Sequence, residues 1–191
     1  MPPTIIDTYI AFTKRWEGGL SRKTADSASA FPCPTPYKGQ TGWHTNVGVT
    51  YKVWKSLFGS DADDRFFAMS ADDWFNVFKT LYWNSVRGDE FTSKNIAIIV
   101  TGVAWGSGKS RAVKTLQTGI RNCGVATDVD GKLGNETMKA ANACNPRQLF
   151  DAITTERERF FRAIAPPGSD NAVFLKGWLN RLADYKATFR P

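Results

Sequence analysis

A glutamate, Glu17, stands directly before two glycines in the stretch RWEGG, and the next carboxylate along the chain is Asp26. Apolar residues recur near a 3.6-residue period over residues 4–17, which predicts a helix that ends where Gly18 begins. A carboxyl group at a helix C-terminus lies beside unpaired carbonyls with partial negative charge, which favours its protonated form. Glu17 is therefore either a solvated residue at a helix end or an acid held over a cleft.

An acid that keeps its proton near neutral pH can donate it to a leaving-group oxygen, and glycoside hydrolysis needs such a group. Asp26 and Thr45 lie on the segment after the helix, where they could hold a water on the opposite face of a sugar. His44, Tyr82 and Trp83 are packing residues by default. They become candidates for sugar contacts only if an acid faces them across a groove.

The elements that would position these residues are predicted to be mainly helical. Residues from about 20 to 49 are rich in Ser, Pro, Gly and Thr, so they are predicted to form a long loop with room for a short hairpin. The run Ile96–Val100 suits a strand or a buried helix, and its place between helices favours the helix. Further helices are predicted from Thr50 to Gly59, over 70–86, 109–122, 135–142 and 146–164, and around residues 174–185.

Composition limits the class of protein. A chain of 191 residues, 42% of them hydrophobic, is long enough for one globular domain with a sizeable core. A membrane span of roughly 20 apolar residues is not found, and the start MPPTIIDTYIAF lacks the pattern of a signal peptide. The net charge of +7 favours polyanionic partners such as nucleic acid, anionic membrane or bacterial cell wall. Three cysteines without CxxC spacing and one histidine argue against a zinc site, so neither a metal nor another cofactor is expected.

Three other motifs are weaker than they first look. GVAWGSGKS follows an apolar run, but five residues separate Gly102 from Gly108, where a phosphate loop needs four. DVDGKLGNET has Lys132 and Leu133 where a calcium loop needs an acid and a glycine, which indicates a turn. The basic residues over 109–122 are scattered around the predicted helix, so a solvated surface is favoured over a DNA-binding helix.

The order WEGG, Asp26 and TNVGVT resembles the N-terminal signature of glycoside hydrolase family 108. LYWNSVRGDEF resembles that family's tyrosine–tryptophan helix, and SGKSRAVKTLQTGIRNCGVATDVDGKLGNETMKAAN resembles the peptidoglycan-binding module that accompanies it. RERFFRAI and FLKGWLNRL resemble its closing helices, so the resemblance covers nearly the whole chain. Two departures stand out: the loop after Asp26 is enlarged, and Gly102 lies near a position where the family has an aspartate.

The resemblance implies a lysozyme-like fold with a small irregular or β lobe after the first helix. It implies an N-acetylmuramidase that cleaves peptidoglycan glycan strands at the β-1,4 bond between N-acetylmuramic acid and N-acetylglucosamine. Glu17 would be the general acid, Asp26 and Thr45 would position water, and His44, Tyr82 and Trp83 would line the groove. The alternatives are a lytic transglycosylase that uses the same Glu17, and a non-catalytic wall-binding or effector protein.

The expected organisation is a catalytic region over residues 1–106, a peptidoglycan-binding subdomain over 107–145 and closing helices over 146–191. We expect a monomer that binds no nucleic acid and inserts into no membrane. We also expect synthesis in the cytoplasm without a signal peptide and action on the cell wall after holin-type or specialised release.

Overall fold

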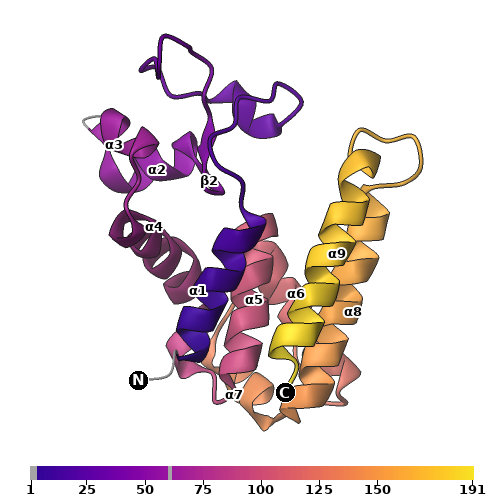
Figure 1. The fold of residues 1–191 in the computed structure, drawn as a ribbon. Helices are drawn as coiled ribbons and strands as arrows, with labels where there is room; N and C mark the ends of the chain where they lie inside the picture. Colours follow the sequence, from indigo (N-terminus) through magenta and orange to yellow (C-terminus); the bar gives the residue numbers. More distant parts are fainter. Residues whose placement is uncertain (1–3, 60–61) are drawn as a thin grey trace. The chain divides into compact units, whose positions relative to one another are not determined.

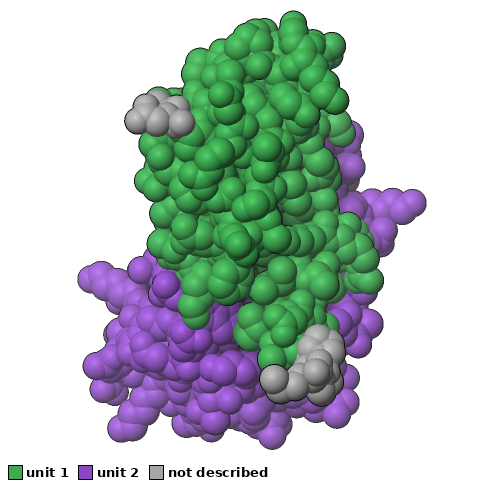
Figure 2. Space-filling model, turned by 60° about the vertical axis from the view of Figure 1, so that its left-hand side comes forward, with its two compact units in different colours: residues 1–81 green, residues 82–191 purple. Residues whose placement is uncertain are grey.

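The computed structural model describes residues 4–59 and 62–191, and the chain divides into two compact units, residues 1–81 and 82–191 (Figure 2). Helices dominate both units, and the irregular lobe with its small sheet follows the first helix. The predicted mainly α class is therefore confirmed.

The first unit contains α1 (Ile5–Trp16), the 3-10 turn η1 (Ser27–Ala30), strands β1 (Thr45–Asn46) and β2 (Val49–Thr50), and helices α2 (Tyr51–Phe58), α3 (Asp63–Phe67) and α4 (Ala71–Val77). A π-helical turn, η3 (Phe78–Trp83), continues from α4. The second unit contains the 3-10 turns η4 (Asn84–Val86) and η5 (Gly88–Glu90), followed by α5 (Lys94–Ser107), α6 (Lys109–Asn122), α7 (Asn135–Ala143), α8 (Pro146–Ile164) and α9 (Ala172–Phe189).

Local capping signals place the helices of the first unit where the sequence predicts them. The side chain of Thr50 accepts a hydrogen bond from the backbone of Val53 and begins α2, which Gly59 ends. Ser70 and Asp73 form the predicted capping box at the start of α4. Helix α3 was not predicted, because five residues are too few to show a helical period.

Aromatic rings build the core of the first unit. The ring of Tyr9 on α1 meets Phe78 edge-on at 5.5 Å between centroids, and Phe78 stacks on Trp74 of α4 at 5.6 Å. All three rings are buried, so α1 is fixed along its apolar face to α4 and to the turn that follows it.

Helix α5 is the central element of the second unit, and the prediction of a buried helix rather than a strand is confirmed. Residues 96–104 are all buried, because α5 packs against α6, α8 and α9 (Figure 1). Ser93 occupies the predicted N-cap position, but its side chain makes no capping hydrogen bond. Burial on every face, rather than capping, therefore keeps this apolar segment helical.

Packing in this unit accounts for the glycine at position 102. A Cβ atom added to Gly102 would lie 2.4 Å from the hydroxyl oxygen of Tyr185, which is fully buried on α9. An aspartate at this position would collide with Tyr185. The close contact between Gly102 on α5 and Tyr185 on α9 thus explains why this position holds a glycine.

Among residues 4–59 and 62–191, none of the helices combines the length and the apolar character that a bilayer crossing requires.

Candidate active site

Glu17 lies at the end of α1, and its carboxyl group packs against a glycine in a hairpin turn. It is the C-cap residue, with an extended backbone (φ −90°, ψ 126°), and its side chain is half-buried. A Cβ atom added to Gly48 would lie 2.4 Å from Oε2 of Glu17. Gly48 must therefore be glycine for the carboxyl group to occupy this position.

The two glycines after Glu17 follow the end of α1, as the sequence predicts. Gly18 follows the C-cap residue, but neither it nor Gly19 has a positive φ, and a Cβ atom on either would meet open space. The prediction that the helix ends before Gly18 is confirmed, although Gly18 needs no left-handed conformation there. The chain leaves α1 in extended form at Glu17 itself.

Strands β1 and β2 form the hairpin under Glu17. Thr45 pairs with Thr50 and Asn46 with Val49, which leaves a two-residue turn at Val47 and Gly48. Both turn residues have positive φ, 46° and 76°, as a type I′ turn requires. A left-handed conformation is rare for a β-branched residue and costs on the order of 1–3 kcal/mol, so Val47 holds strain directly beside the candidate acid.

Two side-chain hydrogen bonds hold the strained hairpin in place. The indole N–H of Trp74 donates to the carbonyl of Val47 at 3.0 Å. The amide of Asn46, which is buried, donates to the carbonyl of Phe66 at 2.7 Å. These bonds connect the turn to α4 and the strand to α3, and they offset part of the strain.

The segment after Glu17 returns to the same hairpin. The backbone N–H of Ser21 donates to the carbonyl of Thr45 at 2.9 Å, and the N–H of His44 donates to the carbonyl of Ser21 at 3.0 Å. This antiparallel bridge adds Ser21 to the edge of β1. It holds the chain that follows Glu17 against the strand that carries Thr45.

His44 connects Thr45 to the turn that carries Asp26. Its Nε2 lies 3.1 Å from the carbonyl oxygen of Lys23, which also accepts the backbone N–H of Asp26 at 3.0 Å. Its Nδ1 lies 2.9 Å from the hydroxyl oxygen of Thr45. The ring is fully buried, so His44 contacts these groups rather than solvent, in contrast to the groove-lining position expected from the sequence.

The hydrogen-bond partners of His44 define the direction of the Thr45 hydroxyl. A carbonyl can only accept, so Nε2 carries the hydrogen that points to Lys23. In a neutral imidazole the other nitrogen then accepts, and Thr45 donates its hydroxyl hydrogen to Nδ1. The lone pairs of the Thr45 oxygen remain as acceptors for another group.

Asp26 is exposed, and its carboxylate is partly used in the local structure. Its Oδ1 accepts the backbone N–H of Ala28 at 2.9 Å and so caps the 3-10 turn η1. The structure therefore ties Asp26, His44 and Thr45 into one set of hydrogen bonds through Lys23, with Glu17 above the same hairpin. Gly48 was not predicted as a site residue although it lies in TNVGVT, because its contact with Glu17 joins positions far apart in the sequence.

Tyr82 and Trp83 belong to the second unit. Trp83 is buried, donates its indole N–H to Oδ1 of Asp89 at 2.9 Å, and packs on Gly88, where a Cβ atom would lie 2.4 Å from its ring. Tyr82 is half-buried, and its ring lies 4.6 Å from that of Trp105. Of this pair, Tyr82 is the residue with surface left for a ligand.

Comparison with known proteins shows the family to which this chain belongs. Residues 10–108, more than half of the chain, match the model of the Glycosyl hydrolase 108 family, and residues 111–183 match a model described as "Predicted Peptidoglycan domain". The search of curated proteins gave no match. A solved structure, "Structure of Brucella abortus SagA", is similar in fold, with a TM-score of 0.72 and 20% sequence identity over 94% of this chain and 90% of that chain.

The first match contains Glu17, Asp26, His44, Thr45 and Gly48, and the second contains most of α6, all of α7 and α8, and most of α9. On these matches, this chain belongs to the glycosyl hydrolase 108 family: it is a glycoside hydrolase that acts on peptidoglycan.

Proposed function

We propose that this hydrolase is an N-acetylmuramidase that cleaves the β-1,4 bond between N-acetylmuramic acid and N-acetylglucosamine, with Glu17 as the general acid. The observation that carries the proposal is the contact between the Glu17 carboxyl group and Gly48, in a strained turn of the hairpin that also bears Thr45. Strain of this kind concentrates at functional sites. A general acid must be held at a fixed point above the bond that it protonates.

The proposed reaction uses Glu17, Thr45 and Asp26 in turn. Glu17 gives its proton to the glycosidic oxygen as the bond from that oxygen to the anomeric carbon breaks. Because its own hydrogen points to His44, the Thr45 hydroxyl accepts a hydrogen bond from the attacking water and turns a water lone pair toward the anomeric carbon. The water adds its hydroxyl group there, and its other proton passes to Asp26.

His44 and Trp83 are positioning residues in this proposal, since both are buried. His44 orients Thr45, and Trp83 holds the segment next to Tyr82. Tyr82 is proposed as the sugar-contacting aromatic residue. Tyr82 is half-buried and keeps part of its ring for a sugar, whereas Trp83 is buried.

Digestion of purified peptidoglycan, followed by mass spectrometry of the product ends, tests the assignment. We expect reducing N-acetylmuramic acid ends with the wild type and a loss of at least ~100-fold in rate with Glu17→Gln. Glu158→Gln on α8, which removes an exposed ion-pair partner of Arg162, is the matched control and should retain activity. Anhydromuramic acid ends would identify a transglycosylase, and clearance by Glu17→Gln at the wild-type rate would refute the proposal.

Two substitutions at position 44 test two roles of His44 separately. One role is to orient the Thr45 hydroxyl, and the other is to hold the turn that contains Lys23. In His44→Asn the amide oxygen can stand near the position of Nδ1 and accept from Thr45, whereas in His44→Gln the amide nitrogen can reach the Lys23 carbonyl in place of Nε2. We expect kcat to fall more in His44→Gln, with KM little changed, and thermal stability to fall more in His44→Asn. Equal losses of kcat in both variants would show that His44 acts only through stability.

A further inference from the structure

The second unit holds a cavity of about 800 Å³, far along the chain from the candidate acid. Its walls are the C-terminal turn of α6, the loop over residues 125–134 and one face of α7. Ala140 and Ala143 lie one turn apart on that face, and their small side chains leave room between the walls. The volume lies within the range of sites that bind small molecules.

Hydrogen bonds fix the loop wall of the cavity. Gln117 on α6 is buried, and its amide nitrogen donates to Oδ1 of Asp130 at 2.8 Å and to the carbonyl of Lys132 at 3.1 Å. Its amide oxygen accepts the backbone N–H of Gly131 at 2.9 Å. One buried side chain therefore holds both sides of the turn, and the loop is preformed.

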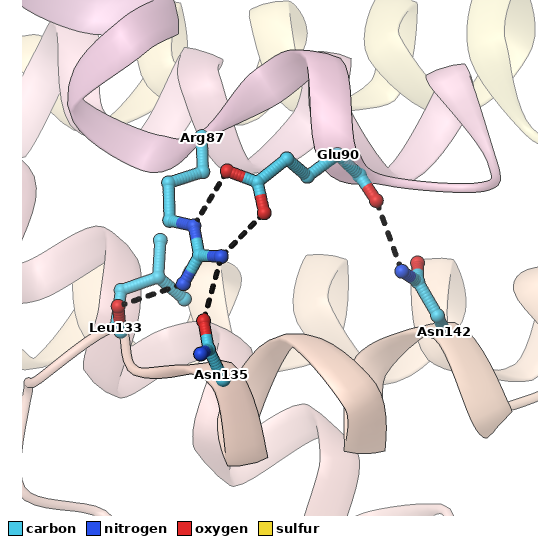
Figure 3. A network of polar contacts seen from close by, with 5 residues as sticks. All are labelled: Arg87, Glu90, Leu133, Asn135 and Asn142. Atoms are coloured by element: carbon cyan, nitrogen blue, oxygen red, sulfur yellow. Dashed lines mark hydrogen bonds and ion pairs between the residues drawn. The ribbon is translucent and has the colours of Figure 1, made fainter.

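A second set of contacts fixes the α7 wall (Figure 3). Arg87 donates to Asn135 at 2.9 Å and to the carbonyl of Leu133 at 3.5 Å, and its guanidinium also pairs with Glu90. At the other end of the helix, the amide of Asn142 donates to the carbonyl of Glu90 at 3.0 Å. Both ends of α7 are thus attached to the segment around η5.

The charges around the cavity are of both signs. Arg121 and Lys139 line it together with Asp128 and Glu136, and all four side chains are exposed. Within the described residues, none of the four takes part in an ion pair. No aromatic residue is among the lining residues, so sugar rings would find no ring on which to stack. These features favour a ligand that carries both carboxylate and ammonium groups.

We propose that this cavity binds the stem peptide of peptidoglycan rather than its glycan strand. The stem is a short peptide with free carboxylates and, where it is not cross-linked, a free amino group. Arg121 and Lys139 pair with its carboxylates, and Asp128 and Glu136 face its ammonium group. The cavity lies wholly within the region that matches the peptidoglycan domain, and the inference rests on the proposed function only in taking peptidoglycan as the substrate.

Calorimetric titration of the full-length Glu17→Gln protein tests the inference, because that variant should not degrade its ligands. The probes are the synthetic tetrapeptide L-Ala-γ-D-Glu-meso-diaminopimelate-D-Ala and glycan strands stripped of peptide by an amidase. We expect saturable binding of the tetrapeptide, weakened about tenfold by Arg121→Ala or Lys139→Ala. Lys176→Ala, which removes an exposed charge from α9 outside the cavity, is the matched control and should bind as before.

Two outcomes would overturn the inference. One is an equal loss of affinity in Lys176→Ala and Arg121→Ala, which would indicate general electrostatic attraction. The other is competition between stripped glycan strands and the tetrapeptide. Digestion of stripped strands by the wild type and Glu17→Gln examines the catalytic proposal separately, since these strands carry no peptide. Peptide binding and Glu17-dependent cleavage can therefore fail independently.

Discussion

At the scale of single residues, the contact between Glu17 and Gly48 decides where the candidate acid stands. The glycines next to Glu17 in the sequence have open space around them, whereas Gly48 has none. The hairpin turn at Tyr37–Gln40 offers a comparison, because Gly39 has nearly the same conformation (φ 71°, against 76° for Gly48) and no atom within 4 Å of an added Cβ. The two glycines share a left-handed backbone conformation but differ in the atoms around them.

Gly48→Ala and Gly39→Ala should therefore have similar effects on stability and different effects on activity. Each places a Cβ atom in a left-handed conformation, at a cost of about 1–2 kcal/mol in the free energy of unfolding. Only Gly48→Ala displaces the Glu17 carboxyl group, so peptidoglycan cleavage should fall at least ~10-fold in that variant alone. Thermal denaturation and turbidity assays measure the two effects. Equal activity in both variants would refute a catalytic position for Glu17.

Burial also changes the reactivity of the cysteine side chains. All three are free thiols, and burial, together with the neighbouring Cys123 thiol, raises the pKa of Cys144 to about 11. Only the thiolate is nucleophilic, so a raised pKa means slow alkylation at neutral pH. We expect iodoacetamide labelling of Cys144 in the folded protein to increase about tenfold per pH unit between about pH 7 and pH 9. Fast labelling at pH 7, as in the denatured control, would contradict this prediction.

At the scale of elements, the β1–β2 hairpin combines a demanding turn with a residue that suits it poorly. Asn followed by Gly is the preferred sequence for a type I′ turn, and this hairpin has Val47 in place of Asn. The bond from Trp74 goes to the backbone carbonyl, so it does not depend on the valine side chain. A substitution at Val47 can therefore relieve the backbone strain and keep the hydrogen bond from Trp74.

Val47→Asn should stabilise the protein by about 1 kcal/mol through relief of this strain. Lys38→Asn is the matched control, because Lys38 occupies the same position in the Tyr37–Gln40 turn (φ 51°) but is not β-branched. The stability that Lys38→Asn gains should be smaller than the stability that Val47→Asn gains. Urea denaturation of both variants checks the difference. A loss of stability in Val47→Asn would show that the valine side chain contributes packing that outweighs the strain.

The turn over residues 130–132 depends on one buried amide. Gln117→Leu removes the acceptor of the Gly131 N–H and the donors to Asp130 and Lys132, which should cost about 1–3 kcal/mol. Gln148→Leu, at an exposed position near the start of α8, should change stability by less than about 0.5 kcal/mol. Urea denaturation gives the free energies, and hydrogen exchange should rise in the turn only in Gln117→Leu. Unchanged exchange there would show that the turn holds its shape without Gln117.

At the scale of the whole molecule, the family matches and the compact units divide the chain at different places. The matches meet between residues 108 and 111, whereas the units meet between Leu81 and Tyr82. Helix α5 falls in the hydrolase match but packs with α6, α8 and α9 in the second unit. The division expected from the sequence, with boundaries at 106 and 145, stays a prediction.

The net charge of +7 predicts a long-range attraction to the anionic cell wall. Binding of the Glu17→Gln protein to purified cell walls should weaken steadily from about 0.05 M to about 0.5 M NaCl, because salt screens exposed charges. Pelleting assays measure the bound fraction. Chitin, an uncharged glycan, is the control and should show little salt dependence. Salt-independent binding to both would show that net charge has no part in wall association.

The sequence by itself determined most of the helices, and the order of its motifs, which resembles family 108, pointed to Glu17 as the candidate acid. Caps such as Ser70 with Asp73, and the apolar period of α1, depend on neighbours within a few residues, so they can be recognised without a structure. The tertiary structure decided what surrounds Glu17. Gly48 under its carboxyl group and the burial of His44 join segments that are distant in the sequence, and the pairing of Ser21 with Thr45 holds these segments together. Such contacts depend on the packing of the whole lobe, and no local pattern encodes them.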